Sequence, residues 1–146
     1  MARIELETVP QGTLAERIRA AGAGVAGFYT RTTVGTPLAE GKPTRVVDGE
    51  TFVLEEPIHA DVALVKADRG DRWGNLTYRL AARNFGPVMC TAATLTIAQV
   101  NQVVDLGAID PEHVVTPGIF VDRVVEVSDP VNETIAMQQG VRFNAS

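Results

Sequence analysis

The sequence contains little of what defines several common protein classes. Its single cysteine, Cys90, excludes an internal disulfide and is typical of a reducing compartment. Eighteen acidic residues outnumber 13 lysines and arginines, and the net charge of -5 argues against general nucleic-acid binding, which needs clustered cations. No apolar run approaches the roughly 20 residues of a membrane-spanning helix, and the first residues lack the apolar core of a signal peptide. We therefore expect a cytoplasmic protein that binds neither nucleic acid nor membrane.

Catalytic and metal-binding residue types are equally scarce. The only two histidines, His59 and His113, stand apart from each other and from Cys90, so the sequence predicts no catalytic triad and no metal site. It contains no glycine-rich nucleotide-binding motif, and we expect no bound cofactor. Both histidines are interpreted as ordinary surface or core residues.

The residues that are present favour one α/β domain. Alternating apolar and polar residues predict a strand from Ile4 to Val9. After a break at Pro10, Thr13 and the glutamate three residues later have the spacing of a capping box, which predicts a helix from Thr13 through Ala21. Further strands are predicted over residues 25–29, 95–100, 102–106 and 119–127, and a helical turn over 110–113. An Asp-Gly pair predicts a β-hairpin over residues 44–54. We expect this hairpin to lie at a sheet edge or above a pocket. From residue 128 the pattern fades, so the predicted organisation is a domain over 1–127 and a polar tail over 128–146.

One segment stands out as a candidate site. The almost continuous apolar run from Asp61 to Ala67 predicts a parallel strand covered on both faces. A polar stretch follows at once and contains the only tryptophan, Trp73, among Gly, Asn and Arg residues. Because ligand sites in open α/β sheets form at the carboxyl ends of strands, we expect this stretch to form a site.

Four blocks of the sequence are similar to one family. They are Pro10-Gln11-Gly12-Thr13 with the helix to Ala20, Gly27-Phe28-Tyr29-Thr30 through Gly35-Thr36, the block from Gly70 to Pro87, and Val115-Thr116-Pro117-Gly118 through Val121. In this order they resemble the A (alpha) subunit of class I CoA-transferases, which act on 3-oxoacids. The resemblance implies an open, mostly parallel Rossmann-like sheet with a β-hairpin insertion.

The resemblance also implies a reaction and a partner. Such enzymes move CoA from succinyl-CoA to a 3-oxoacid through a glutamyl-CoA thioester. The block from Gly70 to Pro87 is most similar to the 3-oxoadipate branch, with the acetoacetate and acetate enzymes close behind. In the family, the nucleophilic glutamate lies in a Ser-Glu-Asn-Gly motif of a B (beta) subunit, and an upstream half of the alpha chain holds a Gly-Gly-Phe-Gly motif; neither motif occurs here. We therefore expect residues 1–127 to be the C-terminal part of an A (alpha) subunit that is inactive without the B subunit.

Seven residues are candidates for binding the substrate: Gln11, Gly12, Thr32, Gly35, Asn75, Arg83 and Asn84. None is a nucleophile, and the glutamates nearest to the loops, at positions 40, 50, 55 and 56, are poor candidates for that role. Glu50 flanks the hairpin turn, and the adjacent pair Glu55 and Glu56 is expected to be solvated.

The amide of Gln11 and nearby backbone N–H groups are placed to meet an anionic oxygen, and the family's glutamine at this position lies beside the acyl substrate. The alternative is a turn glutamine that faces water. Thr32 and Gly35 belong to a hydroxyl-rich loop that either faces the substrate or simply connects two strands. Thr33 stands where the family usually has Gly, and a threonine does not readily adopt a positive φ, which predicts a loop of different shape.

The remaining candidates have structural alternatives as well. Asn75 and Asn84 either bind the substrate or tie down turns through their own amides. Arg83 pairs either with a substrate carboxylate or with an acidic residue of this chain. Trp73 either anchors the loop or lines a pocket.

Two functions of different classes follow from the sequence. The chain is either part of the alpha subunit of a CoA-transferase, or a non-catalytic module that keeps the fold and binds an acyl-CoA, a small acid or another protein. Fold alone does not decide between them.

Overall fold

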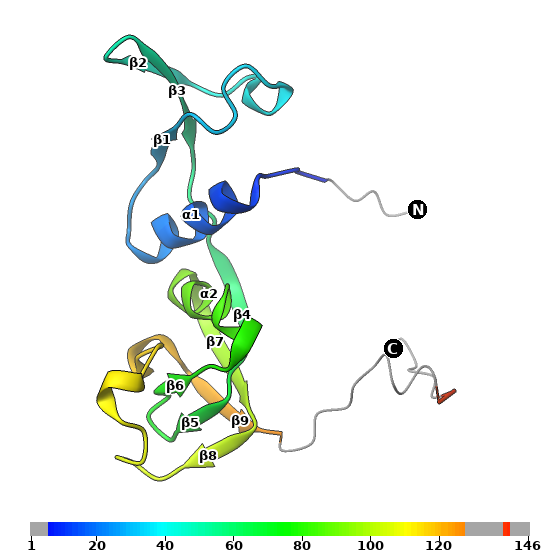
Figure 1. The fold of residues 1–146 in the computed structure, drawn as a ribbon, viewed down its shortest axis with the longest axis vertical. Helices are drawn as coiled ribbons and strands as arrows, with labels where there is room; N and C mark the ends of the chain where they lie inside the picture. Colours follow the sequence, from blue (N-terminus) through cyan, green and yellow to red (C-terminus); the bar gives the residue numbers. More distant parts are fainter. Residues whose placement is uncertain (1–5, 128–138, 141–146) are drawn as a thin grey trace.

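A computed structural model describes residues 6–127 and 139–140. These residues form three three-stranded sheets and two helices that follow one another along the long axis of the molecule (Figure 1). An antiparallel sheet lies at one end, the helices α1 and α2 lie in the middle, and two sheets with parallel pairings lie at the other end.

The antiparallel sheet contains the predicted hairpin. It consists of β1 (Phe28–Thr30), β2 (Thr44–Val47) and β3 (Glu50–Glu55) in the order β1-β3-β2, so the hairpin strand β2 lies at a sheet edge, as predicted. Asp48 and Gly49 connect β2 to β3 with φ angles of 50° and 80°, the two positive values of a type I′ turn. The first strand begins three residues later than the predicted strand over 25–29, and a short 3-10 turn, η1 (Pro37–Ala39), lies in the connection to β2.

The helix α1 (Gln11–Gly22) packs against the helix α2 (Gly86–Ala92). The predicted capping box is wrong, because α1 begins two residues before Thr13, whose hydroxyl is buried and has no hydrogen-bond partner. Pro10 occupies the N-cap instead, and its carbonyl accepts the first helical hydrogen bond from the N–H of Leu14 at 2.9 Å. The predicted strand over 4–9 is wrong for the described residues 6–9, which have no strand beside them to pair with; residues 4 and 5 lie outside the described part.

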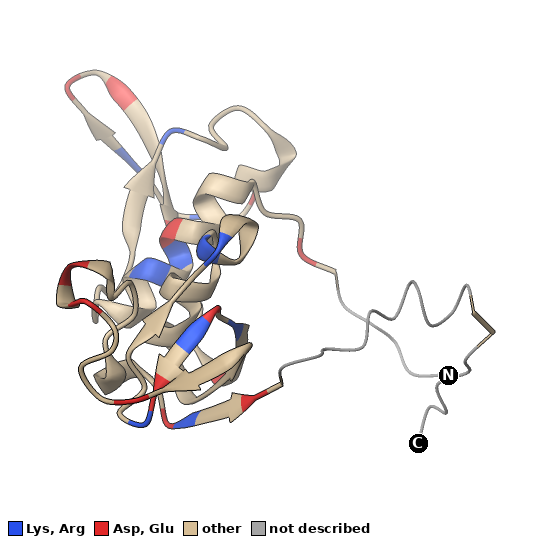
Figure 2. Ribbon diagram, turned by 60° about the horizontal axis from the view of Figure 1, so that its bottom comes forward, with Lys and Arg blue, Asp and Glu red and all other residues tan. Residues whose placement is uncertain are grey.

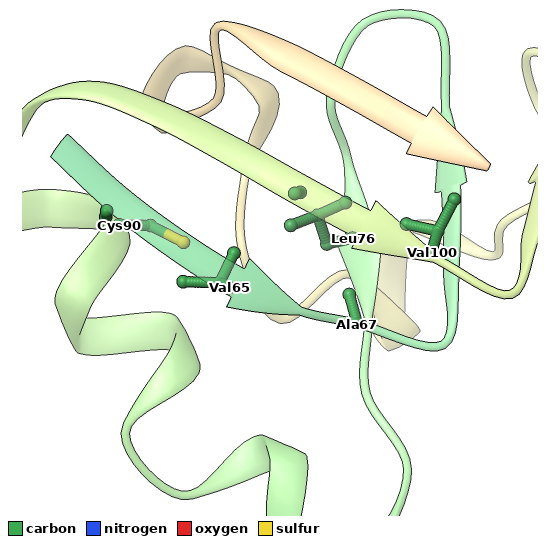
Figure 3. Close-up of a cluster of buried hydrophobic side chains, with 7 residues drawn as sticks. Val65, Ala67, Leu76, Cys90 and Val100 are labelled. Atoms are coloured by element: carbon green, nitrogen blue, oxygen red, sulfur yellow. The ribbon is translucent and has the colours of Figure 1, made fainter. Parts of the chain in front are cut away.

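The parallel sheet consists of β4 (Ala60–Lys66), β7 (Ala93–Val100) and β9 (Arg123–Glu126) in that order. One face of it is covered by α2 and forms the core. Seven buried side chains form this core: Ala63, Val65, Ala67, Leu76, Cys90, Ala98 and Val100. Figure 3 shows them gathered around β4, β7 and α2.

The opposite face of β4 corrects the prediction of a strand covered on both sides. Val62 is 48% exposed and Leu64 is 71% exposed, while Ala63 and Val65 between them are buried. The described helices explain this, because α1 packs on α2 and leaves the other face of the sheet open.

The third sheet surrounds the predicted polar stretch. It consists of β5 (Arg69–Asp71), β6 (Leu76–Thr77) and β8 (Gln102–Val104) in the order β6-β5-β8. The predicted strands over 95–100 and 102–106 are confirmed with shifted ends, but β5, β6 and α2 were not predicted. Both β5 and β6 are too short to show an alternating pattern.

Three 3-10 turns complete the fold: η2 (Leu80–Arg83), η3 (Pro111–His113) and η4 (Gly118–Phe120). The turn η3 matches the predicted helical turn, and the side chain of Asp110 caps it by accepting from the N–H of Glu112 at 3.0 Å. The turn η4 replaces the start of the predicted strand over 119–127, so that strand begins only at Arg123. The predicted tail lies outside the described residues except for 139–140, and no helix of the described part is long and apolar enough to cross a membrane.

Candidate functional site

The turn between β5 and β6 is held by a buried carboxylate. Asp71 is 4% exposed, and its Oδ1 accepts from the backbone N–H groups of Trp73 and Asn75 at 2.9 and 3.0 Å. Its Oδ2 accepts from Nδ2 of Asn75 at 2.8 Å, and Oδ1 of Asn75 accepts from the N–H of Gly118 at 3.0 Å. The amide of Asn75 is therefore engaged at both ends, and of the two predicted roles the structure shows the turn-tying one.

The same turn brings two distant sequence blocks together. A Cβ atom on Gly118 would lie 2.0 Å from the carbonyl oxygen of Trp73, so only glycine fits there. Leu76 adds a backbone hydrogen bond from its N–H to the carbonyl of Thr116 at 2.9 Å. Trp73 is 67% exposed, so the interpretation of its side chain as an anchor of the loop is wrong. The close approach of Gly118 to the backbone of Trp73 holds the loop instead.

A polar cluster lies beneath this turn and joins it to α2. The hydroxyl of Tyr78 lies 2.8 Å from Oγ1 of Thr116 and 3.7 Å from Sγ of Cys90. Cys90 donates to the carbonyl of Gly86 at 3.2 Å. Burial raises the pKa of the Tyr78 hydroxyl and the pKa of the Cys90 thiol, which keeps both groups protonated near neutral pH. This cluster is structural rather than nucleophilic, since a reactive cysteine needs a lowered pKa.

Three hollows surround the carboxyl end of β4. The Arg83 hollow has a volume of about 520 Å³ and is lined by Asp68, Arg69, Thr77, Tyr78, Arg83, Glu112, His113, Val114 and Val115. The Arg79 hollow, about 310 Å³, is lined by Lys66, Ala67, Asp68, Arg79, Leu80, Ala81, Ala82 and Asn101. The β4 trough, also about 310 Å³, is lined by Leu64, Val65, Lys66, Ala81, Ala82, Asn84, Phe85, Gly86 and Met89. Their position is the one that open α/β sheets use for ligands.

Four cations lie around these hollows: Lys66, Arg69, Arg79 and Arg83. None of the four forms an ion pair with another described residue. Figure 2 shows acidic and basic positions interspersed over the described ribbon rather than gathered on one face, so any attraction for an anion is local to this edge. Of the predicted residues, Arg83 and Asn84 lie here. Arg83 forms no ion pair with a described acidic residue, although Asp68 and Glu112 line the same hollow. Sequence reasoning missed Lys66, the last residue of β4, Arg69, the first residue of β5, and Arg79, the N-cap of η2.

The other predicted residues lie elsewhere. Gln11 and Gly12 are the exposed first residues of α1, and none of the three hollows includes them. Thr32 and Gly35 belong to the loop after β1, at the end of the molecule opposite to the hollows (Figure 1). Oγ1 of Thr32 shares a hydrogen bond of 2.9 Å with Thr30, and Gly35 has a φ of +75°. The described chain therefore does not gather all seven candidates into one site.

The loop around Thr33 takes a conformation that threonine tolerates. Thr33 is 1% exposed, does not have a positive φ, and its carbonyl accepts from Oγ1 of Thr36 at 2.7 Å. The position that needs the left-handed region is Gly35, two residues later.

The glutamates near the loops are engaged or exposed. Glu55 is 2% exposed, and its two carboxylate oxygens accept from Nζ of Lys42 at 2.8 and 2.9 Å, so the prediction that it is solvated is wrong. Glu55 is the last residue of β3 and lies on the buried face of that strand, which the presence of two adjacent glutamates in the sequence does not indicate. Glu50 pairs with Arg31 on the surface. Within the described residues no group of three or more His, Cys, Asp and Glu side chains is arranged to hold a metal ion.

Comparison with known proteins identifies the family. The model of the coenzyme A transferase family matches residues 2–127. The chain belongs to the coenzyme A transferase family. It is 65% identical over 134 residues to the A subunit of 3-oxoadipate CoA-transferase from Pseudomonas putida, a match that covers 92% of this chain and 58% of the relative. It is 48% identical over 122 residues to the alpha subunit of acetate CoA-transferase from Escherichia coli strain K12, covering 84% of this chain and 56% of the relative. The chain thus spans slightly more than half the length of these curated relatives.

A solved CoA-transferase confirms the α/β fold class. The crystal structure of glutaconate coenzyme A-transferase from Acidaminococcus fermentans superposes with a TM-score of 0.73 at 20% identity, over 82% of this chain and 45% of that chain. At this identity the likeness shows the fold alone. In this member of the coenzyme A transferase family, hydrogen bonds from Asp71 through Asn75 to Gly118 join the block from Gly70 to Pro87 to the block from Val115 to Val121.

Proposed function

We propose that this chain is part of the A subunit of a CoA-transferase that moves CoA from succinyl-CoA to a 3-oxoacid. The observation that carries the proposal is the 65% identity over 134 residues to the A subunit of a 3-oxoadipate CoA-transferase. The lower identity of 48% to the corresponding chain of an acetate CoA-transferase favours 3-oxoadipate over acetate as the acceptor. With Cys90 as its only cysteine, we place the activity in the reducing cytoplasm.

The chemistry is divided between two subunits in this proposal. CoA transfer needs a carboxylate nucleophile, donors that stabilise an oxyanion, and groups that hold the acid substrate. The buried carboxylates of Glu55 and Asp71 are occupied by Lys42 and by the β5–β6 turn. The resemblance to class I CoA-transferases implies that the nucleophile is a glutamate of a B subunit, and we propose that this residue forms the glutamyl-CoA thioester. CoA thioesters are substrates here rather than resident cofactors.

This chain supplies polar and cationic groups to the shared site. We assign to Gln11, the exposed first residue of α1, the role of donating its amide to an anionic oxygen of the substrate. Arg83 and Arg69 line a hollow of about 520 Å³, which Asp68 and Glu112 line as well, and we propose that Arg83 pairs with the carboxylate of the substrate. A role at a subunit boundary also accounts for the exposure of both Gln11 and Arg83.

A chimaera tests the proposal. Residues 2–127 replace the matching segment of the A subunit from Pseudomonas putida, and the hybrid is co-expressed with the B subunit of that enzyme. We expect succinyl-CoA-dependent formation of 3-oxoadipyl-CoA, measured as thioester absorbance. A hybrid that assembles with the B subunit but transfers CoA to no 3-oxoacid would instead favour the non-catalytic binding module.

The Gln11→Ala variant of the chimaera tests the role of that side chain. We expect kcat/KM to fall by at least roughly 10-fold, as for the loss of one oxyanion or positioning contact. Gln102→Ala is the matched control, because Gln102 is an exposed glutamine of β8 far along the chain from α1. Equal turnover of both variants would remove Gln11 from the site.

A further inference from the structure

Arg17 ties α1 to two other segments of the chain. Its side chain is 12% exposed, whereas that of Arg19, two residues later on the same helix, is 54% exposed. Nε of Arg17 donates to the backbone carbonyl of Glu56 at 2.7 Å, and Nη1 donates to Oε1 of Glu7 at 2.7 Å. The backbone carbonyl of Arg17 also accepts from the N–H of Ile58 at 3.0 Å. One residue therefore joins α1 to the segment before it and to the linker between β3 and β4.

The linker over residues 56–59 is the junction between the antiparallel sheet and the parallel sheet. α1 lies across this junction in the middle of the molecule (Figure 1). The guanidinium of Arg17 is a rigid planar fork, so hydrogen bonds to two different segments restrain both its position and its direction. Arg17 therefore fixes the orientation of α1 relative to the place where the two sheets meet.

The two ends of α1 are held differently. At the C-terminal end, Gly22 lies so close to α2 that a Cβ atom there would be 2.1 Å from Oγ1 of Thr91. At the other end, the N-cap Pro10 supplies no side-chain hydrogen bond, and the hydroxyl of Thr13 has no partner among the described residues. Apolar packing of this half is non-directional. The directional contacts that restrain the first half of α1 are therefore those of Arg17.

The length of α1 converts a small rotation into a displacement of Gln11. Gln11 lies about 16 Å along the helix from Gly22, so a tilt of about 4° about that end moves Gln11 by about 1 Å. A misplacement of about 1 Å can cost about 10²-fold in rate when it affects a group at a reacting centre. The amide of Gln11 is therefore useful for transfer only if α1 keeps the orientation that Arg17 sets.

We propose that Arg17 is a positioning residue, which holds α1 in the orientation that presents the amide of Gln11 to the substrate. The inference rests on the proposed function, because it takes the role of Gln11 in CoA transfer as given. Arg17 itself does not contact the substrate and acts through Gln11.

A double-mutant cycle in the chimaera tests the proposal. Arg17→Met keeps the unbranched stem of the side chain and removes the guanidinium. We expect it to lower kcat by roughly 5- to 10-fold and to change the KM of the 3-oxoacid by less than about 2-fold, as for a contact made in the transition state. In the Gln11→Ala background the same substitution should lower kcat by less than about 2-fold, because the amide that Arg17 positions is gone. A loss of folded enzyme would instead lower kcat by the same factor in both backgrounds, and that result refutes the proposal.

Arg19→Met is the matched control, because Nε of Arg19 binds Glu16 of the same helix at 2.9 Å and the side chain is exposed. It should leave kcat within about 2-fold of the parent chimaera. Glu7→Ala serves where Arg17→Met disturbs folding, since Glu7 is 61% exposed and its loss removes one of the two side-chain contacts of Arg17. We expect Glu7→Ala to lower kcat by about 3-fold and Glu7→Gln, which keeps an acceptor oxygen, to restore it. A kcat for Glu7→Ala equal to that of Arg19→Met refutes the proposal as well.

Residual dipolar couplings of the 146-residue chain separate this proposal from the transferase assignment. We expect Arg17→Met to rotate the N–H vectors of α1 together by several degrees relative to the parallel sheet, and Arg19→Met to leave them unchanged. Unchanged couplings in Arg17→Met refute the positioning role even if the chimaera is active. An inactive parent chimaera together with a rotated helix would overturn only the transferase assignment and the role of Gln11 in it, and would still show that Arg17 sets the orientation of α1.

Discussion

Replacing Asn75 by aspartate should reveal whether this residue is a structural amide or a ligand contact. Nδ2 of Asn75 lies 2.8 Å from Oδ2 of Asp71, which is 4% exposed. The Asn75→Asp variant therefore sets two carboxylates against each other at this distance. At an effective dielectric constant of about 20, two full charges there repel by about 6 kcal/mol.

Proton uptake limits this penalty. Binding one proton to an aspartate at pH 7 costs about 4 kcal/mol, from roughly three pH units at about 1.4 kcal/mol each. Because this is less than the repulsion, the folded variant takes up a proton, and the protonated carboxyl can donate in place of the lost amide. We expect Asn75→Asp to lose about 3 to 4 kcal/mol of unfolding free energy at pH 7.

The pH dependence has a definite sign. The folded variant binds a proton near neutral pH that the unfolded chain does not, so its stability falls as pH rises. Between pH 5 and pH 7 we expect a loss of about 1.4 kcal/mol per pH unit relative to the parent chain. Asn75→Ala, which cannot titrate, should lose about 2 kcal/mol at every pH in this range.

Urea denaturation followed by far-UV circular dichroism measures these differences. Asn101→Asp is the control, because Asn101 also donates to an aspartate, at 3.1 Å, but on the surface. Water screens that pair, and we expect a change below about 1 kcal/mol. If Asn75→Asp is as stable as the parent chain at pH 7 and shows no pH dependence, the amide is not committed to Asp71 and is free for a ligand.

Three further predictions concern stability and reactivity. Lys42→Ala leaves the carboxylate of Glu55 buried without its cation and should cost about 3 kcal/mol in urea denaturation, whereas the same stability as the parent chain would mean that Glu55 finds another partner. Gly118→Ala should cost at least about 2 kcal/mol because its Cβ would meet a backbone carbonyl at 2.0 Å, while Gly12→Ala has open space and should be neutral or stabilising by up to about 1 kcal/mol; similar melting temperatures for the two would contradict the close contact. Burial raises the pKa of Cys90, so Ellman's reagent should modify it slowly at pH 8 and rapidly only in denaturant; fast modification of the native chain would show that the thiol is accessible.

The sequence predicted best those features that a short stretch determines by itself. The β2–β3 hairpin follows from Asp48 and Gly49, which need no partner elsewhere to form their turn. The cap of η3 is equally local, since Asp110 binds an N–H two residues later.

Features that depend on distant residues were predicted poorly. The amide oxygen of Asn75 accepts from the N–H of Gly118, 43 residues away, and no local pattern distinguishes that amide from a substrate contact. The prediction of a solvated Glu55 failed because its partner Lys42 lies 13 residues earlier, across the hairpin. The apolar run of β4 correctly indicated a parallel strand, but its composition carries no information about which described element covers each face.

The candidate site shows the same division. The carboxyl end of β4 was located from the sequence, because the polar stretch follows the apolar run directly. Its cations were recognised only in part: Arg83 stands in a family block, whereas Lys66 has the pattern of an ordinary strand end. The two hollows that Lys66 lines lie between β4 and η2, which are distant in the sequence pattern.

The pairing of β9 with β7 has a consequence for synthesis of the chain. The sheet order β4-β7-β9 and the hydrogen bond from Gly118 to Asn75 can form only after the residues near the end of the family match at residue 127 have been synthesised. A ribosome adds roughly 5 to 20 residues per second, so a nascent chain spends seconds with β4, β7 and the 70–78 turn made but unable to close. During that interval the edge of β7 that later pairs with β9 is available to wrong partners. Chaperones that hold nascent chains should therefore engage this chain until about residue 126 has emerged, and shortening it before Gly118 should abolish folding of the whole half that carries the candidate site.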